Sequence, residues 1–185
     1  MRLKRVWLHI VCVAVCLIGC AVVLQRHRAR ATANKIFGNM TYLTTYPDWF
    51  EEVTLKNGRY HWSYKSDVFL TYSYAQLFYH LDYEGHYVYG DFNHDDLKDA
   101  AVIISEGEGG SGDFRALAFL INNGQSFVHR VSHGLGDRVR INSLKKRGDK
   151  VVVDMFVHRE TDCSAWPTKR VKYVYEYLSP TPQYG

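Results

Sequence analysis

The chain has 185 residues, of which 46% are hydrophobic and 15% aromatic, and its formal net charge is +4. Six of its 23 lysines and arginines lie in the first thirty residues, where no acidic residue occurs. The rest of the chain therefore carries 17 basic against 19 acidic side chains. A domain of this balance lacks the basic face that nucleic-acid binding requires, so no nucleic-acid partner is expected.

Residues 1–24 are predicted to be a signal or transmembrane anchor. The segment Val6–Leu24 has no charged residue, and as a helix it would span about 28 Å, close to the thickness of a hydrocarbon core. It is either an uncleaved transmembrane helix or a lipoprotein signal, because Leu17–Cys20 (LIGC) resembles a bacterial lipobox that would lipidate Cys20. Both readings predict attachment to a membrane of the cell envelope, with the domain outside the cytoplasm, periplasmic or extracellular.

The segment after the anchor is polar and basic, and residues 25–38 are expected to be a linker. Residues 39–178 are predicted to form one β domain and residues 179–185 a tail. Predicted strands, in chain order, are Glu51–Lys56, Arg59–Tyr64, Asp99–Ser105, Phe114–Asn122, Ser126–Ser132, Arg138–Lys145, Lys150–His158 and Lys169–Leu178. The segment Ser66–Leu81 is rich in Tyr, Phe and Leu and is open to either strand or short helix.

Turn signals separate these strands. Asn57-Gly58 is the strongest short hairpin signal in the chain, and Asn122-Asn123-Gly124 and Arg147-Gly148-Asp149 mark two further turns. Short strands joined in this way predict a mostly β fold, a single antiparallel sheet, sandwich or small barrel following the membrane segment. Cys163 is the only cysteine outside the anchor, so a disulfide-stapled scaffold is not expected.

The segment Gly90–Asp99 (GDFNHDDLKD) is the sharpest candidate site. Counted from Asp91 as the first place of the loop, side chains that carry oxygen stand at alternate places. A hard cation needs such ligands together with a backbone carbonyl near the seventh place. The predicted calcium ligands are Asp91, Asn93, Asp95, the carbonyl of Leu97, and Asp99. The crowded carboxylates repel one another unless a cation is present.

The same loop is not an EF-hand, because its twelfth place is Val102 rather than Glu. It resembles the calcium loops of FG-GAP and integrin-propeller repeats, which join two strands. Those loops have Gly at the sixth place, where this chain has Asp96, a residue that adopts a left-handed backbone less readily. Modest calcium affinity is therefore expected.

The order of several motifs resembles a family of small, uncharacterised bacterial envelope lipoproteins. The shared pattern is a GDxNxDxxxDAAV loop at Gly90–Val102, then glycine-rich residues 109–112, Leu135–Val139 and Val151–Met155. Met40–Tyr42 and Val53–Gly58 also fit the opening of that family. The resemblance implies an envelope location and a β fold, and no activity.

Other motifs indicate less. Gly107, Gly109 and Gly112 satisfy a G-x-G-x-x-G spacing, but the neighbouring Glu106 and Glu108 would repel a pyrophosphate. A zinc or thiol site would have to assemble dispersed residues, namely His129, His133, His158, Asp137, Asp162 and Cys163. No ligand spacing supports that assembly.

Two functions are compatible with these observations. The first is a membrane-tethered, calcium-stabilised binding or structural module of the cell envelope without catalysis. The alternative is an envelope hydrolase whose site combines dispersed His, Asp and Ser residues, which requires a nucleophile and a base within hydrogen-bond reach. No catalytic residue is assigned, and the ligand or protein partner is not predicted.

Overall fold

A computed structural model describes residues 2–45, 51–65, 76–109, 111–163, 165–178 and 183–184. Within these ranges the side chains of residues 2–14, 64–65, 76–77 and 183–184 are not described. The chain forms one long helix followed by strands, in the order α1 (Arg2–Phe37), β1 (Thr41–Leu43), β2 (Glu52–Thr54), β3 (Arg59–Lys65), β4 (Gln76–Gly90), β5 (Asp99–Glu108), β6 (Phe114–Asn122), β7 (Phe127–Asp137), β8 (Arg140–Arg147), β9 (Lys150–Val157), β10 (Lys169–Tyr175) and β11 (Gln183–Tyr184).

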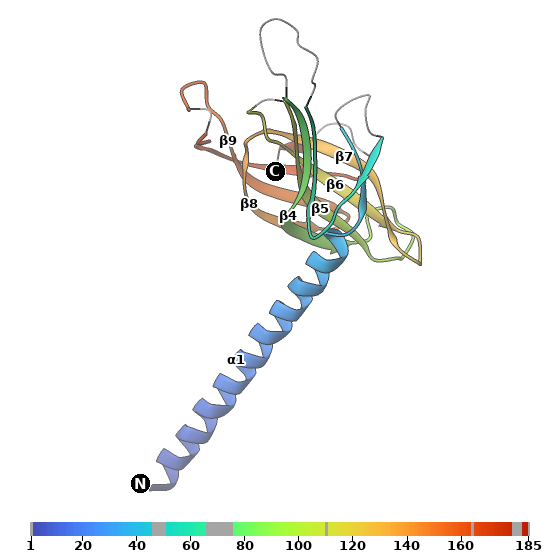
Figure 1. Ribbon diagram of the computed structural model, residues 1–185. Coiled ribbons are helices and arrows are strands. Elements are labelled where there is room, and N and C mark those ends of the chain that lie inside the picture. The colour runs from blue at the N-terminus through green and yellow to red at the C-terminus, as the bar shows by residue number, and fades with distance from the viewer. Residues whose placement is uncertain are drawn as a thin grey trace, which may run out of the picture.

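The strands form three antiparallel sheets, which confirms a mostly β antiparallel fold (Figure 1). The largest has the order β3-β4-β5-β6-β7, the second β11-β10-β9-β8, and β1 pairs with β2. None of the sheets formed by the described strands closes on itself, so the small barrel is not the arrangement found.

The central sheet is buried on both faces. Residues Ala100–Ile104 of β5 are completely inaccessible, because alternate side chains of a strand point to opposite faces. Ala100, Val102 and Ile104 pack toward β1, β2 and the end of α1. Ala101 and Ile103 pack toward β8, β9 and β10. The predicted strand Asp99–Ser105 thus lies at the centre of the domain.

The predicted turns form as expected. Asn57 and Gly58 have φ values of 54° and 88°, and Lys56 and Arg59 exchange two backbone hydrogen bonds across them. Both central residues with positive φ fit the hairpin turn that Asn-Gly favours. Gly124 and Gly148 likewise have positive φ at the two later turns.

The second half of β4 is a strand that the sequence pattern does not predict. Its pairing with β5 shifts register between Tyr83 and Tyr87, and Gly85 in this bulge has a φ of 74°. A bulge inserts unpaired residues and interrupts the alternation of faces. Residues 82–90 therefore show no clean period of two, and most of the preceding segment, 66–75, lies outside the described residues.

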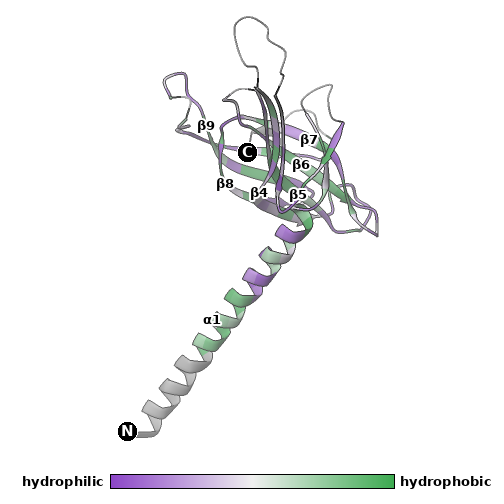
Figure 2. Ribbon diagram, viewed as in Figure 1, coloured by the Kyte–Doolittle hydropathy of each residue, from purple (hydrophilic) through white to green (hydrophobic). Residues whose placement is uncertain are grey.

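Helix α1 runs without a break from the apolar segment into the β domain (Figures 1 and 2). Residues 25–38, expected to be a linker, are helical through Phe37, and both Ala33 and Phe37 are buried. These two residues are one turn apart and so share a helix face. In the part of the chain that the structure describes, no helix has the length and apolar character needed to cross a membrane.

The end of α1 is tied to the β domain by several contacts. The Phe37 ring packs against four aromatic rings, with centroids 5.6–6.0 Å apart: Tyr83, Tyr87, Tyr89 and Phe127. The Tyr42 hydroxyl donates to the Phe37 carbonyl at 2.9 Å, and the Gly58 N–H donates to the Gly38 carbonyl at 2.7 Å. A Cβ on Gly38 would lie 2.9 Å from Gly58 N, so only glycine permits this approach.

Candidate functional site

The loop between β4 and β5 is the predicted calcium site. β4 ends at Gly90 and β5 begins at Asp99, so the loop joins two adjacent antiparallel strands of the central sheet. This is the position that the resemblance to strand-joining calcium loops implies.

Three of the predicted ligands are held by backbone N–H groups of the same loop. The Asp91 carboxylate accepts from the N–H groups of Asp95 and Asp96, both at 3.2 Å. The Asn93 Oδ1 accepts from Asp95 N–H at 3.3 Å, and the Asp95 Oδ1 accepts from Leu97 N–H at 2.8 Å. Each side chain thus curls over the residues that follow it, which is the local bonding that Asp and Asn favour in turns.

The backbone at Asp96, the sixth place of the loop counted from Asp91, is left-handed. Glycine at that place in FG-GAP loops allows the same conformation. Asp96 has a φ of 63° and His94 a φ of 62°. A non-glycine residue in this region carries backbone strain. His94 also lies 3.3 Å from an oxygen of Asp149, in the turn between β8 and β9.

Asp99 has a structural role in the same loop. It is fully buried, and its two oxygens accept from Phe92 N–H at 2.8 Å and from Asn122 N–H at 2.9 Å. It therefore joins the loop to the end of β6. A carboxylate oxygen that accepts one such bond retains a lone pair, so these bonds do not by themselves occupy every acceptor position of Asp99.

The donor set suits a hard cation in its chemistry, because it consists of carboxylate, amide and carbonyl oxygens. Leu97, whose backbone carbonyl is also a predicted ligand, is exposed. Among the described residues, no group of three or more His, Cys, Asp or Glu side chains is placed to hold a metal ion. The N–H groups of the loop supply part of the stabilisation that a cation would otherwise give to Asp91 and Asp95.

The dispersed histidines do not come together. His129 packs against Tyr42 on one face of the central sheet, whereas His133 packs against Phe119 on the other. The pairing of β6 with β7 shifts register at this point, leaving Arg130 unpaired, and such a bulge reverses the faces of the residues beyond it. Cys163 is a free, exposed thiol.

Among the described residues, one histidine, His129, forms a hydrogen bond with a serine. Its Nε2 lies 3.0 Å from Ser132 Oγ, and its Nδ1 accepts the N–H of Leu43 at 2.9 Å. Because Nδ1 is an acceptor, the ring proton is on Nε2, which donates to the serine. A general base needs the opposite tautomer, with Nε2 free to take the serine proton. The bond from Leu43 thus joins β1 to β7, and the pair of His129 with Ser132 does not activate a nucleophile.

A charged cluster at one end of the central sheet was not predicted. The Arg115 guanidinium lies 2.9 Å from Asp113 Oδ2 and 3.5 Å from Glu84 Oε1. His80 lies 3.9 Å from the other oxygen of Asp113, which is longer than a hydrogen bond. Two acids therefore share a single guanidinium, and Oδ1 of Asp113 is buried without a hydrogen-bond partner.

The cluster also accounts for part of the glycine motif. A Cβ on Gly107 would lie 2.6 Å from Cε1 of His80 and 2.7 Å from the Gly112 carbonyl oxygen. Glycine is therefore needed at 107 so that His80 can lie across β5. Gly109 has a φ of 54°, a left-handed backbone that glycine adopts without cost. Both glycines have local structural reasons that are unrelated to nucleotide binding.

Glu106 is a buried carboxylate with structural partners. It accepts the Tyr79 hydroxyl at 2.7 Å and the Thr45 N–H at 3.0 Å. Burial, followed by the hydrogen bond to Glu106, raises the pKa of Tyr79. The pair links β4, β5 and the segment after β1.

Comparison of the chain with protein-family models, with curated protein sequences and with solved structures gives no match. The resemblance to envelope lipoproteins and to FG-GAP calcium loops therefore stays a prediction.

Proposed function

We propose that the protein is a membrane-tethered module of the cell envelope that binds or organises a partner without catalysis, and that calcium stabilises its β4–β5 loop. The observation that carries the proposal is the continuity of α1 with the core. Helix α1 contains the proposed anchor and ends with two buried residues, Ala33 and Phe37. Their burial fixes the orientation of the β domain relative to the helix. A flexible tether would leave the domain free to turn.

Calcium has a defined place in this proposal. Asp91, Asn93, Asp95 and Asp99, with the Leu97 carbonyl, would supply the oxygen ligands that Ca²⁺ takes in proteins. The strand ends on either side fix the spacing of the loop, and Asp99 already anchors it to β6. When bound, the ion would neutralise the crowded carboxylates.

Calcium should raise the melting temperature of the full-length protein in nonionic detergent. A ligand that binds only the folded state stabilises it by about 2.7 kcal/mol at a hundredfold excess over its dissociation constant. With Asp96 at the left-handed position, a dissociation constant of about 10⁻⁴–10⁻³ M is expected, as in extracellular modules. The measurement is thermal unfolding in chelator and in calcium raised to about 100 mM, a hundredfold excess over the weaker of these dissociation constants.

Asp95→Asn should abolish the calcium-dependent shift while keeping an oxygen to accept the Leu97 N–H. Asp96→Gly should enlarge the shift, because glycine adopts a positive φ without strain. The matched control is Glu160→Ala, which removes an exposed acid outside the loop. Identical melting curves of the wild-type protein with and without calcium would show that the loop is only an acidic turn.

The tether should be separable from the domain at residue 24. We expect the full-length protein to remain with membranes after alkaline carbonate extraction, and a variant lacking residues 2–24 to be released as a folded protein. That deletion keeps Ala33 and Phe37, which the core requires. Recovery of the full-length protein in the soluble fraction would contradict the proposed attachment.

The two kinds of anchor are distinguished by Cys20, an exposed residue of α1. If Cys20 is lipidated, Cys20→Ala or globomycin changes the mass of the mature protein. If the helix itself is the anchor, both leave the mass and the membrane retention unchanged. Cys16→Ala, one turn earlier on the same helix, is the control for loss of a cysteine as such.

A further inference from the structure

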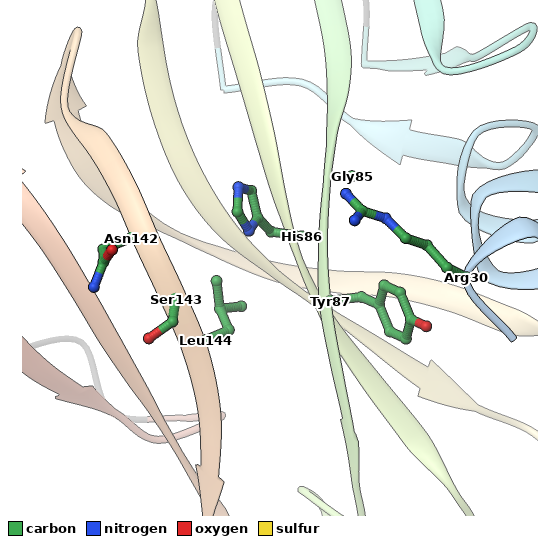
Figure 3. Close-up of a pocket in the computed structure, with 7 residues that line it drawn as sticks. All are labelled: Arg30, Gly85, His86, Tyr87, Asn142, Ser143 and Leu144. Atoms are coloured by element: carbon green, nitrogen blue, oxygen red, sulfur yellow. The ribbon is translucent and has the colours of Figure 1, made fainter. Parts of the chain in front are cut away.

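A pocket of about 310 Å³ lies where the end of α1 meets strands β4 and β8 (Figure 3). Its walls are formed by the following residues: Arg30, Gly85, His86, Tyr87, Asn142, Ser143 and Leu144. Ligand pockets in proteins begin at about 300 Å³. The pocket therefore suits a small polar group rather than a nucleotide or a large cofactor.

Two bulges create this pocket. In β4, the residues between Tyr83 and Tyr87 stand opposite Ile103 alone. In β8, pairing with β9 shifts register between Ile141 and Ser143, so Asn142 has no partner in the ladder. Bulges leave backbone groups outside the regular ladder and occur beside functional sites more often than elsewhere.

The guanidinium of Arg30 is directed from α1 toward Gly85, and His86 projects from β4 on the side of β8 (Figure 3). A Cβ on Gly85 would lie 3.9 Å from Nη2 of Arg30. Any larger side chain at this position would occupy the space beside the guanidinium. A Cβ alone would make only an ordinary van der Waals contact with the guanidinium, and it is the φ of 74° that favours glycine at 85.

The lining residues favour an anion. They include Arg30 and no carboxylate, and within the described part of the chain Arg30 has no ion-pair partner. Of the two acids next to the pocket, Asp154 accepts from Arg170 at 2.6 and 2.8 Å, and Glu84 lies 3.5 Å from Arg115, a guanidinium that it shares with Asp113.

His86 adds a neutral hydrogen-bond donor to the lining. Its imidazole lies on the side of β4 that faces β8, whereas the Ser143 hydroxyl points away from His86 and Arg30 (Figure 3). Burial is the main cause that lowers the pKa of His86, Arg30 and Arg115 lower it further, and Glu84 opposes them. A ring held neutral in this way can donate one hydrogen bond to an oxyanion.

We propose that this pocket binds a phosphate group, with Arg30 as the charged ligand and His86 as a neutral donor. Guanidinium groups match phosphate oxygens in geometry as well as charge. The source is either a phospholipid headgroup or a free phosphate ester. The lipid source rests on the proposed membrane tether, because Arg30 lies six residues beyond Leu24, or about 9 Å along the helix axis, at the depth of lipid phosphates.

The test measures dissociation constants by isothermal titration calorimetry on the full-length protein in nonionic detergent. One arm titrates glycerol phosphate, and the other titrates phosphatidylglycerol presented in the same micelles. Arg30→Gln should weaken binding about tenfold to a hundredfold, the range for a hydrogen bond to a charged group. His86→Phe should weaken it by a smaller factor in the same arm.

The matched control is Arg28→Gln, which removes an equal charge from an exposed residue of the same helix outside the pocket. Unchanged binding by this variant, with loss in Arg30→Gln, supports the pocket. Equal loss in both would show attraction to the helix as a whole and overturn it, as would the lack of saturable binding in either arm. Because glycerol phosphate needs no membrane, its arm tests the pocket even if the protein is not tethered.

Discussion

Phe37→Ala should lower the free energy of unfolding by about 3–5 kcal/mol, the usual cost of deleting a fully buried aromatic ring. The Phe37 side chain has no exposed surface and contacts four aromatic rings of the β domain. Its loss would leave a cavity between α1 and the central sheet. Urea unfolding of the full-length protein in nonionic detergent, followed by tyrosine fluorescence, is the measurement.

Lys35→Ala is the control for this change, because it alters an exposed residue in the same last turn of α1. It should change the free energy of unfolding by about 1 kcal/mol or less. Equal effects of the two substitutions would mean that the helix end is not part of the core. A large effect of Phe37→Ala alone would place the domain boundary upstream of Ala33.

Acidification should destabilise the protein through His129, mainly between pH 6.5 and 4. Burial lowers the pKa of His129 from 6.5 to about 4 in the folded state. Between these values the unfolded chain binds a proton that the folded chain does not, so stability falls as the pH falls through this range. The shift corresponds to about 3 kcal/mol. Below the folded pKa both states are protonated, and this contribution ends.

The measurement is the free energy of unfolding at a series of pH values for the wild-type protein and for His129→Asn. The amide of Asn can accept the Leu43 N–H that His129 Nδ1 accepts, and it does not titrate. The variant should lose most of the slope between pH 6.5 and 4, retaining the smaller part due to His86 and His133, whose pKa values burial also lowers. His27→Asn, at an exposed position of α1, should leave the profile unchanged. An unaltered slope in His129→Asn would contradict this role.

Local chemistry made several features predictable. Asn57-Gly58 specifies its hairpin because both residues accept positive φ, and Ala100–Ile104 forms a doubly buried strand because no polar side chain interrupts it. The segment Gly90–Asp99 joins two strands, as its resemblance to strand-joining loops implies, and Asp96 has the left-handed backbone expected at its place. Calcium binding by this loop stays a prediction.

Features that depend on long-range contacts were not predictable in this way. The end of α1 looked like a linker because Gln25–Lys35 is mostly polar. The spacing of Ala33 and Phe37, one helical turn apart, was the available signal of a buried face. The bulges in β4 and β7 were hidden because each removes the alternation from which strands are recognised. The Arg30 pocket joins residues more than fifty positions apart, and no local pattern brings them together.

The unbroken passage of α1 into the core also fixes a rotational phase between helix and domain. Each residue added to or removed from an α-helix turns everything beyond it by about 100° and shifts it by about 1.5 Å. One residue inserted between Leu24 and Ala33 would therefore swing the domain about a quarter turn around the helix axis, whereas about seven would restore its heading at a greater height. The length of this stretch of α1 determines which side of the domain lies in a given direction around the helix axis.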